Sequence, residues 1–348
     1  MNGRVSIRTF IFLTVVAAVA GAALAIRFPH DPYVRYQAFD DTIFHKLKWV
    51  YERLAFDEKP IDVLVVGASR SGRGINTAEL EKALAARGIE VGIANVSVPA
   101  AGFDERLTII REALTHHENV KLIIWGVVEA FPRDGHQIFA NLAQPGEVFS
   151  SPFIVNRNLP GNLARLPYRQ MEYWLATMLP EAFGYQLEFD EDNYLGSDPD
   201  HRLFNNPDWD PAAEREKVGT QEHADALAAE SKWRRRSITP PILPESLMDV
   251  EFGASRSYVR ELMQLSHDMG FDVAFLFLPF YDGYDAPLEE AWLVRYGPVW
   301  KANFLMDDPR NYVDAGHASV IGAPKLISWL SELITPYFSG QSNESATN

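Results

Sequence analysis

Short apolar runs alternate with amphipathic stretches in two separate parts of the chain. Three runs, at residues 61–66, 90–96 and 120–128, are almost entirely apolar, which is typical of strands that are buried on both faces of a sheet. A fourth run of this kind lies at residues 271–278. Between and after these runs, apolar residues recur every three or four positions, which predicts helices over residues 76–88, 103–117, 255–269 and 324–334. Strands that alternate with helices at this spacing predict parallel βαβ units.

The α/β pattern divides the chain into a domain and an insertion. Residues 60–130 and 253–338 are expected to form one three-layer α/β domain, with about five parallel strands in the flavodoxin-like order. Residues 131–252 interrupt the pattern, are rich in Pro, Asn, Asp and Trp, and contain helical patches near residues 166–179 and 210–236. An insertion of this size after a strand predicts a lid or a substrate wall, and a loop without a ligand role is the alternative.

The N-terminus has the pattern of an export signal. Arg4 and Arg8 precede an uncharged run of 18 residues, residues 9–26, which is mostly apolar. The run ends in a small-x-small sequence that suits cleavage after Ala25, and its length is also at the lower limit for a bilayer span. Residues 1–26 are therefore expected to be a signal peptide or an uncleaved membrane anchor. Either form places the protein in the periplasm or on the periplasmic face of the inner membrane.

Two further segments lie outside the α/β domain. Residues 27–59 are predicted to contain an amphipathic helix that packs on the domain, because apolar residues recur every three or four positions at Phe39, Ile43, Leu47, Val50 and Leu54. Residues 339–348 are small and polar, and we expect this tail to be disordered.

The composition excludes several classes of function. A net charge of −15 argues against nucleic-acid binding, because a phosphate backbone attracts clustered Lys and Arg. The absence of cysteine excludes disulfides, thiolate catalysis and Cys-ligated metals. Asp190 and Asp192 begin a D-x-D sequence, but Tyr194 stands where a calcium loop needs a third oxygen ligand. We therefore expect no metal and no cofactor.

A serine and a D-x-x-H sequence are the residues best suited to chemistry. Residues 63–76, VLVVGASRSGRGIN, place Ser69 and Ser71 in a turn after a predicted strand, where α/β proteins gather their active sites. Ser69 is preferred because it comes earlier in the turn, although a serine that only satisfies turn amides is the alternative. Asp314 and His317 lie three residues apart before the last helix. This spacing lets the carboxylate orient an imidazole that activates a serine hydroxyl.

These residues resemble the sequence blocks of the SGNH (GDSL-like) hydrolase superfamily. The matching parts are Gly67-Ala-Ser69, Asn95-Val-Ser-Val-Pro-Ala-Ala-Gly102, and Asp314-Ala-Gly-His317 with Gly322. The chain is most similar to the cell-envelope branch, which includes alginate O-acetylation proteins and the D-alanyl transfer protein of teichoic acid modification. The resemblance implies that Ser69 is the nucleophile, His317 the general base and Asp314 the orienting carboxylate. It also implies that the amides of Ser69 and Gly102 are oxyanion donors.

One block departs from the superfamily pattern. Gly126-Val-Val-Glu129 stands where the superfamily has G-x-N-D, so the asparagine that donates to the oxyanion is absent. Loss of one such donor costs about 100- to 1,000-fold in rate. Arg70, Asn95 and Arg133 are candidate substitutes, but Arg70 has an alternative role in an ion pair with Glu129 and Asn95 has one as a strand-end cap. The candidate substrate-binding residues are Arg70, Asn95, Glu129, Arg133 and His136.

The resemblance implies an exported serine ester hydrolase or O-acyltransferase, with acetyl as the expected acyl group. Its expected ligands are a cell-envelope polysaccharide or the acyl donor, and a membrane acyltransferase is a candidate partner. The alternative is a non-catalytic protein of the same fold that binds glycan or a partner in an exopolysaccharide export or modification complex. The missing asparagine favours this alternative, whereas the intact Ser, His and Asp favour the enzyme.

Overall fold

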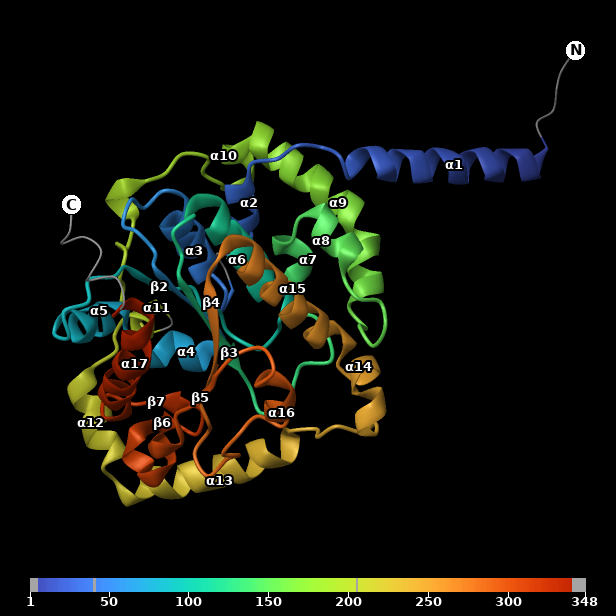
Figure 1. Cartoon of the computed structure of the whole chain (residues 1–348). Helices are drawn as coiled ribbons and strands as arrows, with labels where there is room; N and C mark the ends of the chain where they lie inside the picture. The colour runs from blue at the N-terminus through green and yellow to red at the C-terminus, as the bar shows by residue number, and fades with distance from the viewer. Residues whose placement is uncertain (1–5, 40–41, 205, 340–348) are drawn as a thin grey trace, which may run out of the picture.

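The computed structural model describes residues 6–39, 42–204 and 206–339, and it contains a five-stranded parallel sheet in the order β2-β1-β3-β4-β5 (Figure 1). This confirms the α/β class and the number of strands. Four strands lie within the apolar runs of the sequence, whereas the edge strand β5 has only three residues and was not located. The strands are β1 (Val63–Val66), β2 (Ile93–Asn95), β3 (Leu122–Val127), β4 (Asp272–Phe277) and β5 (Val299–Lys301).

Helices cover both faces of the sheet, which explains why its strands are mostly apolar. In β1, Leu64 and Val66 pack on one side, while Val63 and Val65 pack on the other. The first side is covered by α3 (Lys46–Ala55), α6 (Asp104–His116) and α15 (Gly253–Met269), and the second by α5 (Thr77–Ala85) and α17 (Gly322–Phe338). Successive strand residues point to opposite faces, so burial of both faces disfavours polar side chains, and the buried Asn95 at the end of β2 is satisfied by hydrogen bonds.

The N-terminal apolar run forms α1 (Ile7–Ala25), which has no buried residue and contacts the domain only near its C-terminal end, at α9. Within the described residues, α1 is the one helix whose length and apolar composition suit a membrane span. After it come α2 (Pro32–Gln37) and α3, so the amphipathic helix is shorter than the sequence pattern indicated. Thr42 Oγ1 donates to the carbonyl of Phe39 and accepts from the amide of Phe44, a turn that competes with helix at this point.

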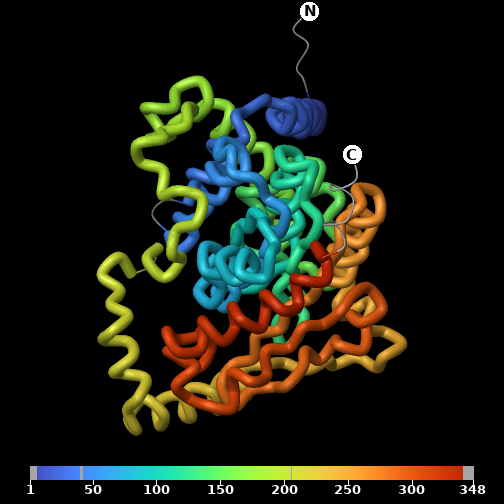
Figure 2. The backbone as a smooth tube through the Cα atoms, turned by 60° about the vertical axis from the view of Figure 1, so that its left-hand side comes forward, coloured from blue at the N-terminus to red at the C-terminus, as the bar shows by residue number. Residues whose placement is uncertain are grey.

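Residues 131–252 wrap around the domain and are mostly helical (Figures 1 and 2). In Figure 2, α12 runs down one edge of the molecule and α13 lies along its base. Side chains of this segment also enter the main core, among them Phe131, Leu142 and Phe252, so the segment is part of the folded body and not only a wall above the sheet. Its helices are α7 (Phe139–Leu142), α8 (Pro145–Ser150), α9 (Leu159–Met178), α10 (Pro180–Phe183), η1 (Glu191–Asn193), α11 (His201–Phe204), α12 (Pro211–Val218), α13 (Gln221–Ser237), η2 (Glu245–Leu247) and α14 (Met248–Glu251).

The remaining elements follow strands β1, β4 and β5 in the chain. They are α4 (Ser69–Gly74), α16 (Glu290–Leu293), η3 (Asn303–Asp307), η4 (Pro309–Asn311), β6 (Tyr312–Asp314) and β7 (His317–Ala318). Of the tail that the sequence predicts to be disordered, residues 340–348 lie outside the described residues.

Candidate active site

Ser69 is the first residue of the short helix α4, which follows directly after β1. The sequence predicted a turn at this position. The helix lies close against the strand ends because residue 67 is glycine: a Cβ there would lie 2.3 Å from Ser71 Oγ. A Cβ at Gly126, in β3, would lie 3.1 Å from the same oxygen. The Ser71 hydroxyl is thus packed between two strands, which supports Ser69 as the serine available for chemistry.

Asp314 and His317 lie on a two-stranded antiparallel hairpin formed by β6 and β7, where the sequence predicted a loop. The turn between the strands fixes the carboxylate: Asp314 Oδ1 accepts from the amides of Gly316 at 2.9 Å and His317 at 3.1 Å. The His317 ring returns to the same carboxylate, with Nδ1 2.9 Å from each of its oxygens. The three-residue spacing therefore orients the ring as the sequence analysis expected.

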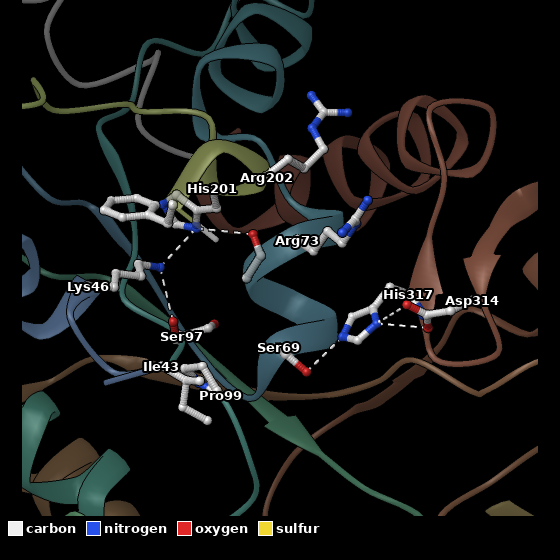
Figure 3. Close-up of a pocket in the computed structure, with 12 residues that line it drawn as sticks. Ile43, Lys46, Ser69, Arg73, Ser97, Pro99, His201, Arg202, Asp314 and His317 are labelled. Atoms are coloured by element: carbon white, nitrogen blue, oxygen red, sulfur yellow. Dashed lines mark hydrogen bonds and ion pairs between the residues drawn. The ribbon is translucent and has the colours of Figure 1, made fainter. Parts of the chain in front are cut away.

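The hairpin brings His317 to Ser69, 248 positions away in the sequence (Figure 3). His317 Nε2 lies 2.8 Å from Ser69 Oγ. When Nδ1 carries the ring proton, it donates a hydrogen bond to Asp314. The unprotonated Nε2 then accepts a hydrogen bond from the Ser69 hydroxyl. Burial would raise the pKa of Asp314, but the hydrogen bond and charge of His317 outweigh it and lower that pKa to about 2. Asp314 is therefore an anion at neutral pH, as an orienting carboxylate must be.

Ser69 and His317 open into a pocket of about 470 Å³. Residues from five parts of the chain line it: the segment before and at the start of α3, the loop after β2, α4, the β6–β7 hairpin, and α11 of the insertion. The lining residues are Ile43, Lys46, Ser69, Gly72, Arg73, Ser97, Pro99, His201, Arg202, Phe204, Asp314 and His317. The insertion thus supplies part of the pocket wall through α11.

Ser97 has a property that the sequence did not reveal. Its side chain is buried, lines the Ser69 pocket, and has an Oγ without a hydrogen-bond partner among the described residues. Its backbone is held on both sides, because its amide donates to Asn95 Oδ1 and its carbonyl accepts from Lys46 Nζ at 3.0 Å. Ser97 therefore carries a buried hydroxyl with unused hydrogen-bonding capacity at the wall of the pocket.

A buried lysine and histidine form the wall opposite the triad. Lys46 Nζ lies 2.9 Å from His201 Nδ1, and it donates to the carbonyl of Asn95 at 3.0 Å. Burial lowers the pKa of Lys46 well below its usual value. Burial, followed by the nearby Lys46, lowers the pKa of His201 in the same direction. No local sequence pattern marks either residue, since they are 155 positions apart.

Two acidic residues of the insertion brace the triad. Glu214 contacts both the helix that carries Ser69 and the segment that follows the hairpin of His317. Its Oε2 pairs with Arg73 of α4 at 2.9 Å, and its Oε1 accepts from the amide of Val320 at 2.8 Å. Glu230 Oε2 accepts from the amide of Ala315, in the turn that carries Asp314. The helix bearing Ser69 and the hairpin bearing His317 are therefore tied together through α12 and α13. No local pattern marks these glutamates, because their partners are distant in the sequence.

Arg70 and Glu129 pair with each other, as the alternative interpretation proposed. The two Arg70 nitrogens Nη1 and Nη2 lie 2.6 and 2.7 Å from the two Glu129 oxygens. Glu129 is buried, and this bidentate contact occupies both of its oxygens. The residue that replaces the expected aspartate therefore holds the residue next to Ser69 in place.

Asn95 and Gly102 also have structural roles. Asn95 is fully buried and donates to the carbonyls of Ser71 at 3.0 Å and Ile75 at 2.8 Å, which fixes α4 to the end of β2. Its amide nitrogen has no capacity left for an oxyanion. Gly102 is enclosed, since a Cβ there would lie 2.5 Å from both Glu105 Oε2 and His136 Cβ. It does not line the Ser69 pocket.

Arg133 and His136 also lie apart from the Ser69 pocket. Arg133 pairs with Glu251 of α14 and lines a second pocket, of about 620 Å³, which also includes Arg70. His136 is buried, and its Nε2 lies 3.0 Å from the carbonyl of Pro99, so it supports the loop after β2. Of the five candidate substrate-binding residues, none lines the pocket that Ser69 and His317 share.

Across the described ranges, no group of three or more His, Asp or Glu side chains is arranged to hold a metal ion. The chain matches no protein-family model and no curated protein.

Proposed function

We propose that the protein is an exported serine ester hydrolase or O-acyltransferase of the SGNH type that acts on a cell-envelope polysaccharide. The observation that carries this proposal is the continuous chain of hydrogen bonds from Ser69 Oγ through His317 to Asp314, with 2.8 Å between Ser69 Oγ and His317 Nε2. Such an arrangement activates a hydroxyl that is otherwise a weak nucleophile. The substrate class and the superfamily come from the resemblance of the sequence blocks.

In the first half of the proposed reaction, Ser69 Oγ attacks the carbonyl carbon of an ester. The Ser69 proton moves to His317 Nε2, and the imidazolium that forms is stabilised by the Asp314 anion. The carbonyl oxygen becomes an oxyanion. His317 then gives its proton to the departing alcohol, which leaves the acyl group on Ser69.

In the second half, water or a sugar hydroxyl attacks the acylated Ser69. His317 accepts a proton from the attacking oxygen and returns it to Ser69 Oγ as the acyl group leaves. Water as acceptor makes the protein a hydrolase, whereas a sugar hydroxyl makes it a transferase. A polysaccharide carrying acetyl esters would serve as donor in the first case and as product in the second.

Ser97 is our candidate for the missing oxyanion donor. Arg70, Asn95 and Arg133 are each engaged elsewhere. Ser97 lines the pocket, its buried Oγ is without a partner in the described part of the chain, and the amide of Ser69 is at the start of a helix, where it lacks an intrahelical acceptor. Together, the Ser97 hydroxyl and the Ser69 amide would stabilise the oxyanion in the absence of the asparagine.

The experiment is acetate release from an aryl acetate and from an acetylated polysaccharide by the full chain in detergent. We expect Ser69→Ala and His317→Ala to lose nearly all activity, because nucleophile and base act as a unit. Ser71→Ala is the matched control and should retain the activity. Binding of the polysaccharide with no acetate release, unchanged in Ser69→Ala, would instead favour the non-catalytic glycan-binding protein.

A further inference from the structure

Helix α9 is apolar on two opposite faces. One face is buried in the domain and includes Leu166, Tyr173 and Ala176. A surface helix normally carries polar residues on its other face. In α9 that face is instead an uncharged stripe with helical spacing, which we call the α9 stripe: Pro160, Ala164, Tyr168, Met171, Leu175 and Met178. Tyr168 is 66% exposed and Met178 62%.

Further exposed apolar side chains lie in α8 and in the segment that joins α8 to α9. Phe149 and Ile154 are each 60% exposed, and Phe153 is 74% exposed. Large apolar side chains scattered singly are normal on a protein surface, but a contiguous set marks an interaction site.

Helix α1 leaves the domain beside the α9 stripe. The residues that follow α1 are packed on α9: the rings of Phe28 and Trp174 are 5.0 Å apart, and the amide of Asp31 donates to Thr177 Oγ1 at 2.9 Å. Ile26 joins the small core that α9 forms with α7 and α8. Figure 1 shows α9 running across the end of α1, not along it.

The length of α1 suits a helix that crosses a bilayer, and the position of α9 suits a helix that lies on the surface of that bilayer. The 19 residues of α1 extend about 28 Å, close to the thickness of the hydrocarbon core. A bilayer crossed by α1 would meet the domain on the side that carries α9. Arg27 and Arg165 are exposed at this side, although the whole chain has a net charge of −15. Basic and aromatic residues are favoured at the headgroup level.

We propose that the α9 stripe, with Phe149, Phe153 and Ile154, lies in the boundary between headgroups and acyl chains of the bilayer that α1 crosses. The domain is then held against the membrane in one orientation. Figure 1 shows α4, α12 and the β6–β7 hairpin on the opposite side of the molecule, so the elements that carry the triad lie away from this bilayer. The inference rests on the proposed function in one respect, which is that the exported protein retains α1 as a membrane anchor. It does not depend on the chemistry at Ser69.

The test uses single cysteines in the full chain, which has no cysteine of its own. Ile154→Cys and Tyr168→Cys report on the proposed surface. Leu195→Cys is the control, because Leu195 is as exposed as Ile154, at 60%, and lies in the segment between η1 and α11, on the far side of the domain from α1 (Figure 1). Each cysteine carries the dye NBD, and the protein is reconstituted through α1 into phosphatidylcholine and phosphatidylglycerol vesicles with nitroxide-labelled lipid.

We expect the NBD emission at positions 154 and 168 to shift to the blue and to be quenched several-fold by the nitroxide lipid, with neither change at position 195. Absence of quenching at all three positions would overturn the proposal, because α1 alone would then tether a domain that stands clear of lipid, or that needs a protein partner on this face. Equal quenching at all three would also overturn it. A chain recovered from cells that begins at Ile26 would do the same, since the anchor would be lost. None of these outcomes bears on labelling of Ser69.

Discussion

Close packing between β1 and α4 predicts that Gly67→Ala displaces the nucleophile. The φ angle of Gly67 is not positive, so its backbone conformation is open to alanine and the obstacle is contact alone. The added Cβ would lie 2.3 Å from Ser71 Oγ and 3.1 Å from Ser71 Cβ. The hydroxyl is able to rotate away, but Ser71 Cβ belongs to the helix. Helix α4, which begins with Ser69, must therefore move.

The expected loss is about 2 kcal/mol of unfolding free energy, within the range for overpacking a core. Activity should fall by about 10-fold, because the contact with Ser71 Cβ requires a shift of a few tenths of an ångström, and a shift of about 1 Å costs about 100-fold. Ser71→Gly alone should cost about 1 kcal/mol, because glycine is a weak helix former. In the double variant the contact disappears, so we expect a total loss near 1 kcal/mol, where simple addition predicts about 3 kcal/mol.

The assay is urea denaturation of the four proteins of this cycle in detergent, together with acetate release from an aryl acetate. Rescue of both stability and activity in the double variant would support the packing argument. The packing argument is wrong if Gly67→Ala is as stable and active as the wild type. It is also wrong if Gly67→Ala lowers the stability and activity of the Ser71→Gly variant as much as those of the wild type.

Three further variants test the surroundings of the triad. Ser97→Ala should lower kcat by about 100- to 1,000-fold with little change in KM, and an unchanged kcat would remove Ser97 as an oxyanion donor. Glu214→Ala should cost about 3 kcal/mol in urea denaturation, because it leaves Arg73 without its buried partner; a loss below about 1 kcal/mol would contradict the bracing role. Asp314→Asn should be less stable than the wild type above pH 3.8, the usual pKa of Asp, and the difference should shrink as the pH falls toward about 2, because a lowered pKa stabilises the fold only while the carboxyl is ionised. Urea denaturation at pH 5 and pH 2.5 measures this, and a difference independent of pH would refute it.

The central part of the fold could be predicted from the sequence because its signals are local. The four apolar runs contain β1 to β4, since burial on both faces leaves a nearly continuous apolar pattern. Asp314 and His317 could be paired because three residues separate them. Ser69 could be placed because a strand ends just before it.

The rest depends on contacts between distant parts of the chain. Strand β5 is too short to leave a pattern, and α4 is held by Asn95, whose role is set by carbonyls 20 and 24 positions away. Glu214 reaches Arg73 across 141 positions. The sequence of the insertion has no periodicity that identifies such a partner. Nor does it indicate that α11 supplies His201 to the pocket.

The most direct test of the account is the reaction of the full chain with a serine-directed fluorophosphonate, followed by intact mass and peptide mapping. Trypsin cleaves after Arg70, so Ser69 and Ser71 fall on different peptides. The account predicts one adduct, on the peptide that ends in Ser69-Arg70, in the wild type and in Ser71→Ala, and none in Ser69→Ala. An adduct that persists in Ser69→Ala, or no adduct in the wild type while its fold is intact, would contradict the claim that Ser69 is an activated nucleophile.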